Sequence, residues 1–262
     1  MIIVSDLHIN STIGLLAPSV RLADGQHISQ SPAQAWSWQK YQDFLAQPKK
    51  GRIVTVFNGE IADKNYHPTT QIITEDVPSI IDMSLATIEP LVSISDKVIV
   101  TRGTEAHAGI GGYIDELIAR EIRAERLGGS DHAHMWAEFM VENVRFDIAH
   151  HPRFGGGSYH TSHNTAGKLA ADMVMYCAKY NRPLPDILIR SHNHSFSDSG
   201  LNYPVRALVT PPWQLSTHFS HRLGYGGKLM PIGGVHVYVS GGKYHIAPSL
   251  YMPDDSGEVQ AV

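Results

Sequence analysis

The N-terminal stretch MIIVSDLH, residues 1–8, decides how the rest of the chain is interpreted. Its first four residues are apolar and largely β-branched, which is typical of a buried strand. Asp6 and His8 follow two positions apart, so on an extended backbone both side chains point to the same side. A carboxylate and an imidazole delivered together are suitable metal ligands, although one such pair often occurs by chance. The meaning of this pair therefore depends on partners elsewhere in the chain.

Composition limits the class of protein. The chain has 262 residues, of which 42% are hydrophobic and 18% are charged, as in an ordinary folded protein. A net charge of −4 argues against broad electrostatic capture of DNA or RNA. The single cysteine, Cys177, excludes an intramolecular disulfide and a cysteine-based zinc site. No apolar run approaches the roughly 18 residues of a membrane span, and the first residues do not read as a signal peptide. We therefore expect a cytoplasmic protein with no membrane partner.

Helices and strands are predicted to alternate along most of the chain. Apolar runs at 52–57, 97–101, 141–149 and 186–190 are typical of buried strands, and residues 10–34 of a long loop. Helical spacing of apolar residues predicts helices over 33–47, 76–95, 113–127 and 165–180. This alternation predicts a parallel or mixed sheet whose ligands gather at the carboxyl ends of its strands. Short β-like runs at 206–210, 234–239 and 244–248 are interpreted as a second sheet packed on the first.

We predict one domain over residues 1–262. Within it, residues 1–195 carry the ligand-bearing strands, and residues 196–262 carry the strands of the second sheet and a polar tail.

Acidic residues and histidines recur at the predicted strand ends, in a chain with 16 histidines. In chain order the five strand ends carry Asp6 and His8, Glu60 and Asp63, Glu105 and His107, His150 and His151, and His192 and His194. Mixed carboxylate and imidazole ligands without thiolates suit Mn, Fe or Zn. Two such ions about 3.5–4 Å apart, bridged by a carboxylate, are suited to hydrolysing phosphate esters.

The order of these blocks resembles the calcineurin-like metallophosphoesterase family. That family's pattern is Asp-x-His, Gly-Asp-x-x-Asp, Gly-Asn-His-Asp/Glu, a histidine, and Gly-His-x-His. The matching blocks are Asp6-Leu-His8, Gly59-Glu60-Ile-Ala-Asp63, Gly103-Thr-Glu-Ala-His107, His150 or His151, and Ser191-His192-Asn-His194. The resemblance runs from residue 3 to about residue 194. It implies an α/β fold, a four-layer α/β/β/α sandwich of two mixed sheets, and a binuclear centre in which a hydroxide bridging two metal ions attacks phosphorus.

The resemblance also implies roles for individual residues. Two divalent or trivalent transition-metal ions are expected as cofactors, one held by Asp6, His8 and His194 and the other by His150 and His192. Glu60 would lie between the ions, where the family has the shorter Asp.

The third block departs further from the family pattern. In one alignment Glu105 is a metal ligand in place of Asn, and His107 is the general acid. In the other, Thr104 takes the Asn position and Glu105 lies behind the ligands. Ser191 stands where the family has glycine, and we expect no consequence of that change.

The sequence offers candidates for the substrate and for the residues that bind it. Arg102, Arg153, His160 and His163 are candidates for substrate binding. A small phosphoester is favoured, with phosphodiesters preferred to monoesters, and nucleic acid is the competing substrate. The alternatives are a DNA-processing exonuclease or phosphatase of the same fold, and a catalytically inactive metal-binding scaffold. The sequence does not predict an oligomeric state.

Overall fold

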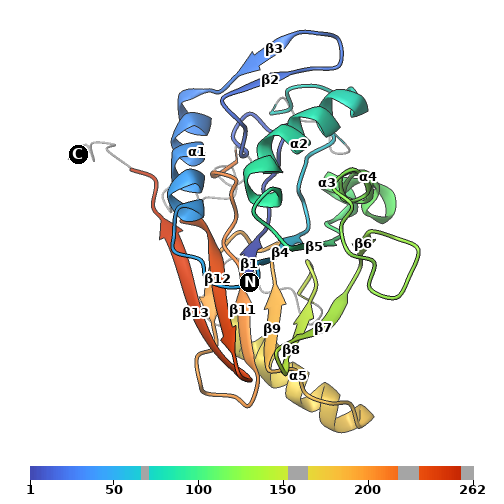
Figure 1. Cartoon of the computed structure of the whole chain (residues 1–262), viewed down its shortest axis with the longest axis vertical. Helices are drawn as coiled ribbons and strands as arrows, with labels where there is room; N and C mark the ends of the chain where they lie inside the picture. The colour runs from blue at the N-terminus through green and yellow to red at the C-terminus, as the bar shows by residue number, and fades with distance from the viewer. Residues whose placement is uncertain (66–70, 153–164, 218–229, 255–262) are drawn as a thin grey trace, which may run out of the picture.

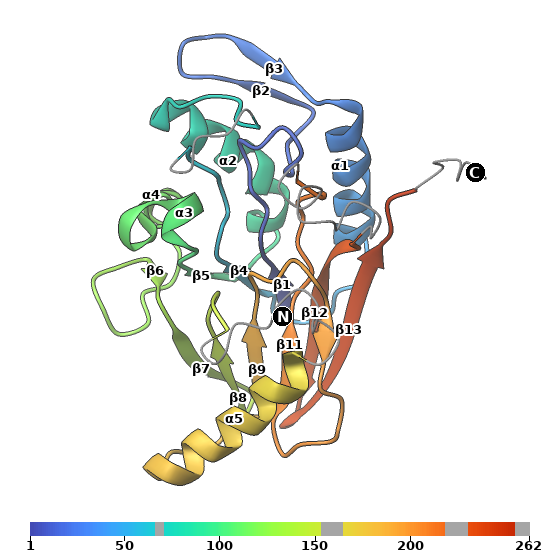
Figure 2. The same ribbon diagram turned by 180° about the vertical axis from the view of Figure 1, so that it is seen from behind.

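The computed structural model describes residues 1–65, 71–152, 165–217 and 230–254 (Figures 1 and 2). Its strands form two larger sheets and one small hairpin. In spatial order the first sheet contains β13 (Lys243–Tyr251), β12 (Ile232–Ser240), β1 (Ile2–Val4), β4 (Val54–Asn58), β5 (Lys97–Thr101) and β6 (Ala133–His134). The second contains β10 (Ser197–Asp198), β11 (Arg206–Val209), β9 (Ile187–Arg190), β8 (Val144–Ile148) and β7 (Ala137–Val141). The hairpin pairs β2 (Ser19–Arg21) with β3 (His27–Ser29).

Both sheets are mixed, with a parallel centre. In the first sheet β1, β4, β5 and β6 run parallel, β12 pairs antiparallel with β1, and β13 pairs antiparallel with β12. In the second sheet β8, β9 and β11 run parallel, with β7 and β10 added antiparallel at the two edges. The carboxyl ends of the parallel strands in each sheet therefore share one edge, where a ligand site is expected.

The helices cover the outer faces of the two sheets (Figures 1 and 2). The helical segments are α1 (Pro32–Leu45), α2 (Val77–Val92), the short α3 (Glu105–Ala108), η1 (Ile110–Gly112), α4 (Tyr113–Glu121) and α5 (Thr165–Tyr180). Among the described helices, none is long and apolar enough to cross a membrane. The start of α1 follows from its sequence. Ser31, the residue before Pro32, forms a reciprocal capping box with Gln34.

Three hydrophobic clusters separate the layers. The first joins the first sheet to α1, α2 and α4 and includes Phe57, Ile80 and Ile114. The second lies between the two sheets and includes Ile3 and Ile189. The third joins the second sheet to α5. The layers are thus α/β/β/α, and the predicted fold class is confirmed.

The assignment of strands to sheets differs from the prediction. β12 and β13, expected in the second sheet, extend the first, with His236 opposite Ile2 of β1. β8 and β9, expected in the same sheet as β1, form the centre of the second. β8, β9 and the first part of β12 are apolar and buried, so their composition does not specify which sheet each one joins.

Two local predictions also change. The helix predicted over 113–127 ends at Glu121, because the backbone leaves the helical conformation at Ile122 and Arg123 takes a φ of 53°. The loop predicted over 10–34 contains the β2–β3 hairpin and the first turn of α1.

Candidate metal centre

Six of the seven predicted ligands come together where parallel strands of both sheets end. Asp6 and His8 follow β1, and Glu60 follows β4, in the first sheet. His150 follows β8, while His192 and His194 follow β9, in the second sheet. The site is therefore built by both sheets, and its halves are separated in sequence by about a third of the chain, from Glu60 to His150.

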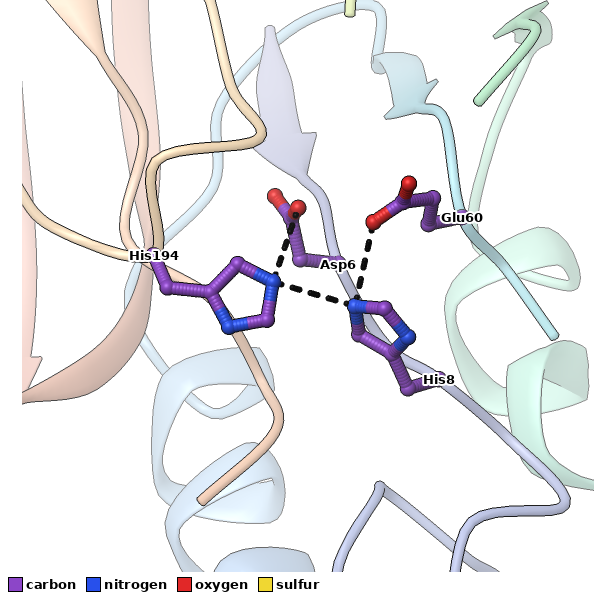
Figure 3. Close-up of side chains that lie close together, drawn as sticks. All are labelled: Asp6, His8, Glu60 and His194. Carbon is purple, nitrogen blue, oxygen red and sulfur yellow. Dashed lines mark hydrogen bonds and ion pairs between the residues drawn. The ribbon is translucent and has the colours of Figure 1, made fainter. Parts of the chain in front are cut away.

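One group contains Asp6, His8, Glu60 and His194, whose side chains point toward one another in Figure 3. His8 Nε2 lies 3.1 Å from His194 Nε2 and 3.1 Å from Glu60 Oε2. His194 Nε2 lies 3.4 Å from Asp6 Oδ1. One potential ligand atom from each residue lies within 4.8 Å of the others, a spacing that a single metal ion could span.

A second group contains Glu60, His150 and His192. Glu60 Oε1 lies 3.3 Å from His150 Nε2 and 3.9 Å from His192 Nδ1. His150 Nε2 is also 3.9 Å from Asp6 Oδ1. Glu60 therefore turns one carboxylate oxygen toward each group, which is the placement expected of a ligand shared between two neighbouring ions.

Several converging atoms are buried and make no hydrogen bond within the described part of the chain. They are both carboxylate oxygens of Asp6, Glu60 Oε2, His150 Nε2 and His192 Nδ1. Buried polar atoms without partners cost free energy, and native proteins contain few of them. A metal ion would satisfy these atoms together, and an oxygen and imidazole set suits Mn, Fe or Zn. The residues present therefore fit a metal centre.

Hydrogen bonds outside the cluster orient two of its histidines. His150 Nδ1 lies 2.7 Å from the backbone carbonyl of Asn58, and His8 Nδ1 lies 2.9 Å from Asp63 Oδ1. A carbonyl and a carboxylate accept hydrogen bonds, so in the neutral rings Nδ1 carries the hydrogen. Each Nε2 then presents its lone pair to the cluster, as metal-binding histidines do.

Electrostatics within the cluster favour charge separation when no metal is bound. Burial by itself lowers the pKa of His8 and His150, but Asp63 and Glu60 outweigh it. The pKa of His8 is raised well above its ordinary value, and that of His150 to about 9. Burial by itself raises the pKa of the Glu60 carboxyl, but His150 brings it well below its ordinary value. The metal-free cluster thus holds protons that metal binding would displace.

Left-handed backbone conformations concentrate at the proposed ligands. The φ angles are 51° at Asp6, 47° at His8, 54° at Glu60, 71° at His192 and 49° at His194. Residues with a side chain rarely adopt this region, and sparsely populated conformations cost about 1–3 kcal/mol each. Strain of this kind persists where neighbouring groups fix it, and five of the ten described non-glycine residues with positive φ are proposed ligands.

Two glycines allow the close approaches that the site requires. A Cβ on Gly59, which has a φ of 77°, would lie 2.5 Å from His150 Nδ1. A Cβ on Gly103 would lie 2.4 Å from the Glu60 Cγ. The close contacts at Gly59 and Gly103 leave no room for a larger side chain, which explains why glycine stands at both positions.

Asp115 is a site residue that the sequence did not reveal. It is fully buried in the first turn of α4, and its carboxylate accepts hydrogen bonds from the backbone N–H groups of Gly103, Glu60 and Ile61 at 2.7, 3.3 and 3.1 Å. Burial raises its pKa and the N–H groups lower it, leaving a pKa of about 6. Asp115 ties the loop after β4 to the loop after β5. Its place in the sequence, near the start of a helix, did not predict this role.

The third block requires a correction, since Glu105 does not join either ligand group. As the first residue of α3 it is exposed, and its carboxylate accepts a hydrogen bond from Gly111 N at 3.3 Å. Thr104 reaches the cluster instead, donating from its hydroxyl and its backbone N–H to Glu60 Oε1 at 2.5 and 3.2 Å. The alignment with Thr104 in the Asn position is the one that agrees with this geometry.

His107 lies at the edge of the cluster. Its Nδ1 is 2.6 Å from Asp63 Oδ1, and its ring stands edge-on to that of His8 at 4.6 Å. Burial by itself would raise the pKa of Asp63, but His8 and His107 lower it well below its ordinary value. The His107 side chain is 40% exposed, whereas that of His8 is completely buried, so an incoming molecule can reach His107.

Arg102 and His151 are the remaining candidates within the described residues. Arg102 was expected to bind substrate, but its guanidinium donates to the carbonyls of Ala133 and Gly111 and to the carboxylates of Glu116 and Asp131. Those bonds fasten the end of β5 to neighbouring loops, and a role of Arg102 in substrate binding stays a prediction. His151 is exposed, with its ring 4.9 Å from that of His192. Arg153, His160 and His163 lie outside the described residues.

Comparisons with known proteins find similarity in structure. Neither protein-family models nor curated protein sequences match the chain. Vps29 from Chaetomium thermophilum is 12% identical over 96% of this chain and 95% of that one, with a TM-score of 0.49. Yfce, a phosphoesterase from E. coli, is 14% identical over 89% of this chain and 85% of that one, with a TM-score of 0.43. The likeness is one of fold. At these values it carries no statement about activity, which has to come from the site itself.

Proposed function

We propose that this protein is a metal-dependent hydrolase of phosphate esters, with phosphodiesters favoured over monoesters. The observation that carries the proposal is the convergence of buried, unbonded ligand atoms on both sides of Glu60. Asp6, His8 and His194 would hold one transition-metal ion, His150 and His192 would hold the other, and Glu60 would be shared. Two ions held in this way would supply an activated water and neutralise charge on the phosphoryl oxygens.

His107 would act on the leaving group. Its Nδ1 is engaged by Asp63, so its Nε2 is the atom left to donate a proton to the departing oxygen. Its exposed position at the rim of the cluster suits contact with substrate, while the buried histidines suit ligation. Asp63 would fix the orientation of His107 and of the ligand His8 with a single carboxylate oxygen.

Thr104 would compensate for the longer bridging carboxylate. Glu60 has one more rotatable bond than the Asp it replaces, and buried side-chain freedom costs free energy when a ligand fixes it. The two donors of Thr104 hold Glu60 Oε1 before any ion binds. Glu60 is therefore preorganised for ligation despite its extra methylene group.

The net charge of −4 favours a small phosphoester over long nucleic acid. The cytoplasmic location stays a prediction from the sequence.

A substrate panel tests the proposal. Protein stripped of metal with a chelator and reloaded with Mn should hydrolyse bis(p-nitrophenyl) phosphate faster than p-nitrophenyl phosphate, and the chelator should abolish both reactions. A His245→Ala variant, which changes an exposed histidine of β13, serves as the matched control and should keep wild-type rates. Metal-loaded protein that is inactive on both esters would contradict the proposal and favour the metal-binding scaffold. Faster degradation of single-stranded DNA than of the small diester would favour the nuclease.

A further inference from the structure

Behind the candidate metal centre, five buried polar side chains form a continuous chain of hydrogen bonds. Each of them has no exposed surface. In order the links are Ser5 Oγ to Thr210 Oγ1 at 2.8 Å, Thr210 Oγ1 to Ser191 Oγ at 2.6 Å, Ser191 Oγ to Asn58 Nδ2 at 2.5 Å, and Asn58 Oδ1 to Thr101 Oγ1 at 2.6 Å. We call this set the inter-sheet network.

The inter-sheet network joins the ends of parallel strands from both sheets. Ser5 follows β1, and Asn58 and Thr101 are the last residues of β4 and β5, all in the first sheet. Ser191 follows β9 and Thr210 follows β11, both in the second sheet. The chain of bonds therefore crosses between the sheets twice, from Ser5 to Thr210 and from Ser191 to Asn58.

These crossings lie next to the proposed ligands. Ser5 immediately precedes Asp6, Ser191 immediately precedes His192, and the backbone carbonyl of Asn58 accepts the hydrogen bond from His150 Nδ1. Asp6 and His192 are two of the residues with a left-handed backbone. A strained conformation persists only where neighbouring groups fix it, and the inter-sheet network fixes the residue before each of the two.

Apolar packing alone does not set the distance between the two ligand groups. Burial of Ile3, Val56 and Ile189 between the sheets is favourable but not directional, so it tolerates small sliding of one sheet over the other. Hydrogen bonds between buried groups have defined geometry and are costly to break. The two crossings thus hold the sheets in register at the edge where the ligands lie.

We propose that the inter-sheet network is a positioning device that keeps the proposed ligands of the two sheets in register. It would chiefly govern occupancy by the ion of Glu60, His150 and His192, since that group takes a single ligand from the first sheet, whereas the other group takes three. The proposal rests on the proposed metal centre. Ser191 is central to it, since its hydroxyl contacts both Asn58 and Thr210. The sequence led us to expect no consequence of a serine here in place of the family's glycine, and the structure assigns that serine a link which glycine could not make.

Variants of Thr210 and Ser191 test the proposal. Thr210→Val removes the hydroxyl and keeps the shape, whereas Thr210→Ser keeps the hydroxyl. Ser191→Gly removes the second link and restores the family's residue. Thr87→Val is the matched control, because Thr87 is a fully buried threonine whose hydroxyl donates to Met83 O in α2, outside the network. Metal-free samples of each whole chain are titrated with Mn and followed by calorimetry, and the loaded samples are examined by electron paramagnetic resonance.

The expected result is selective loss of one ion. Wild type, Thr210→Ser and Thr87→Val should bind two ions and show the signal of a coupled Mn pair. Thr210→Val and Ser191→Gly should bind one ion as wild type does and the other at least about tenfold more weakly, as when partners behind metal ligands are removed. The signal of the coupled pair should weaken with it.

Two outcomes would overturn the proposal. One is that Thr210→Val and Ser191→Gly bind both ions with wild-type affinity and coupling. The other is that both ions weaken to the same extent in these variants, whether or not Thr87→Val binds them as wild type does. If Thr210→Val does not fold, Ser191→Gly decides alone. Wild-type protein that binds two ions but hydrolyses no ester would contradict the proposed function, and the positioning result would still be measured.

Discussion

One oxygen atom of Asp63 forms hydrogen bonds with two histidines that have different expected roles. Its Oδ1 lies 2.9 Å from His8 Nδ1 and 2.6 Å from His107 Nδ1. His8 turns its other nitrogen toward the metal cluster, whereas His107 is open to incoming molecules. The proposed general acid is thereby held at a fixed position relative to a proposed ligand.

Replacing His107 should affect substrates according to their leaving groups. His107→Ala should lower kcat by about a hundredfold or more on a dinucleotide, whose alkoxide needs a proton, since acid catalysis contributes roughly 10²–10⁴-fold. The loss on bis(p-nitrophenyl) phosphate should be at least tenfold smaller, because p-nitrophenolate leaves unprotonated. Steady-state rates with both esters provide the measurement. Equal losses on both would show that His107 is not the acid.

The contact of Thr104 with Glu60 makes a second residue-scale prediction. Thr104→Val removes the hydroxyl donor to Glu60 Oε1 and should weaken Mn binding by about tenfold, while Thr104→Ser should bind Mn as wild type does. Calorimetric titration of metal-free protein measures the difference. Equal affinities for the valine and serine variants would mean that the hydroxyl does not preorganise Glu60.

At the scale of elements, α4 is joined to the loops after β4 and β5 by hydrogen bonds to Asp115. Asp115→Ala should lower the free energy of unfolding by about 3 kcal/mol or more, because three buried backbone N–H groups lose their acceptor at roughly 1–3 kcal/mol each. Asp82→Ala, an exposed aspartate of α2, is the control and should change it by less than about 0.5 kcal/mol. Urea denaturation compares the two. A difference under about 1 kcal/mol between them would mean that Asp115 contributes little.

Helices and strands were predictable where the spacing of apolar residues within the segment is typical of one structure. The bounds predicted for β5 and α5, 97–101 and 165–180, are those of the structure. Motif spacing brought Asp6, His8, Glu60, His150, His192 and His194 forward as candidates, and the fold gathers them. Motif spacing left Thr104 and Glu105 as alternatives at one position. Asp115 was not found in this way, because it binds backbone N–H groups that only the folded loops bring together. Glu105 was misplaced for the same reason, since spacing alone does not show where a side chain points at a helix start.

At the scale of the whole molecule, the sequence did not predict which strands join which sheet. Nothing in the apolar runs of β8, β9 and β12 distinguishes their partners, which are set by contacts across the whole fold. This assignment matters for the proposed metal centre, because three of its proposed ligands follow strands of the first sheet and three follow strands of the second.

Stability should depend on pH in opposite directions with and without metal. The folded-state pKa of His150, about 9, lies above its ordinary value of 6.5. Its protonation therefore stabilises the metal-free fold fully below pH 6.5, and that contribution is lost as the pH rises through about 9. Metal ligation needs the neutral ring, so it should strengthen over the same range. Thermal unfolding with chelator and with excess Mn would show the two trends, and parallel trends would contradict this assignment.

The metal content of an Asp6→Ala variant tests the central claim most directly. Asp6 is buried, neither of its carboxylate oxygens has a hydrogen-bond partner within the described residues, and it faces both His194 and His150. Wild type and the Asp82→Ala control, reloaded with Mn, should each contain two ions per chain and hydrolyse bis(p-nitrophenyl) phosphate. Asp6→Ala should keep its circular dichroism spectrum, contain at most one ion and lose the activity. An Asp6→Ala variant that retains two ions and full activity would contradict the account.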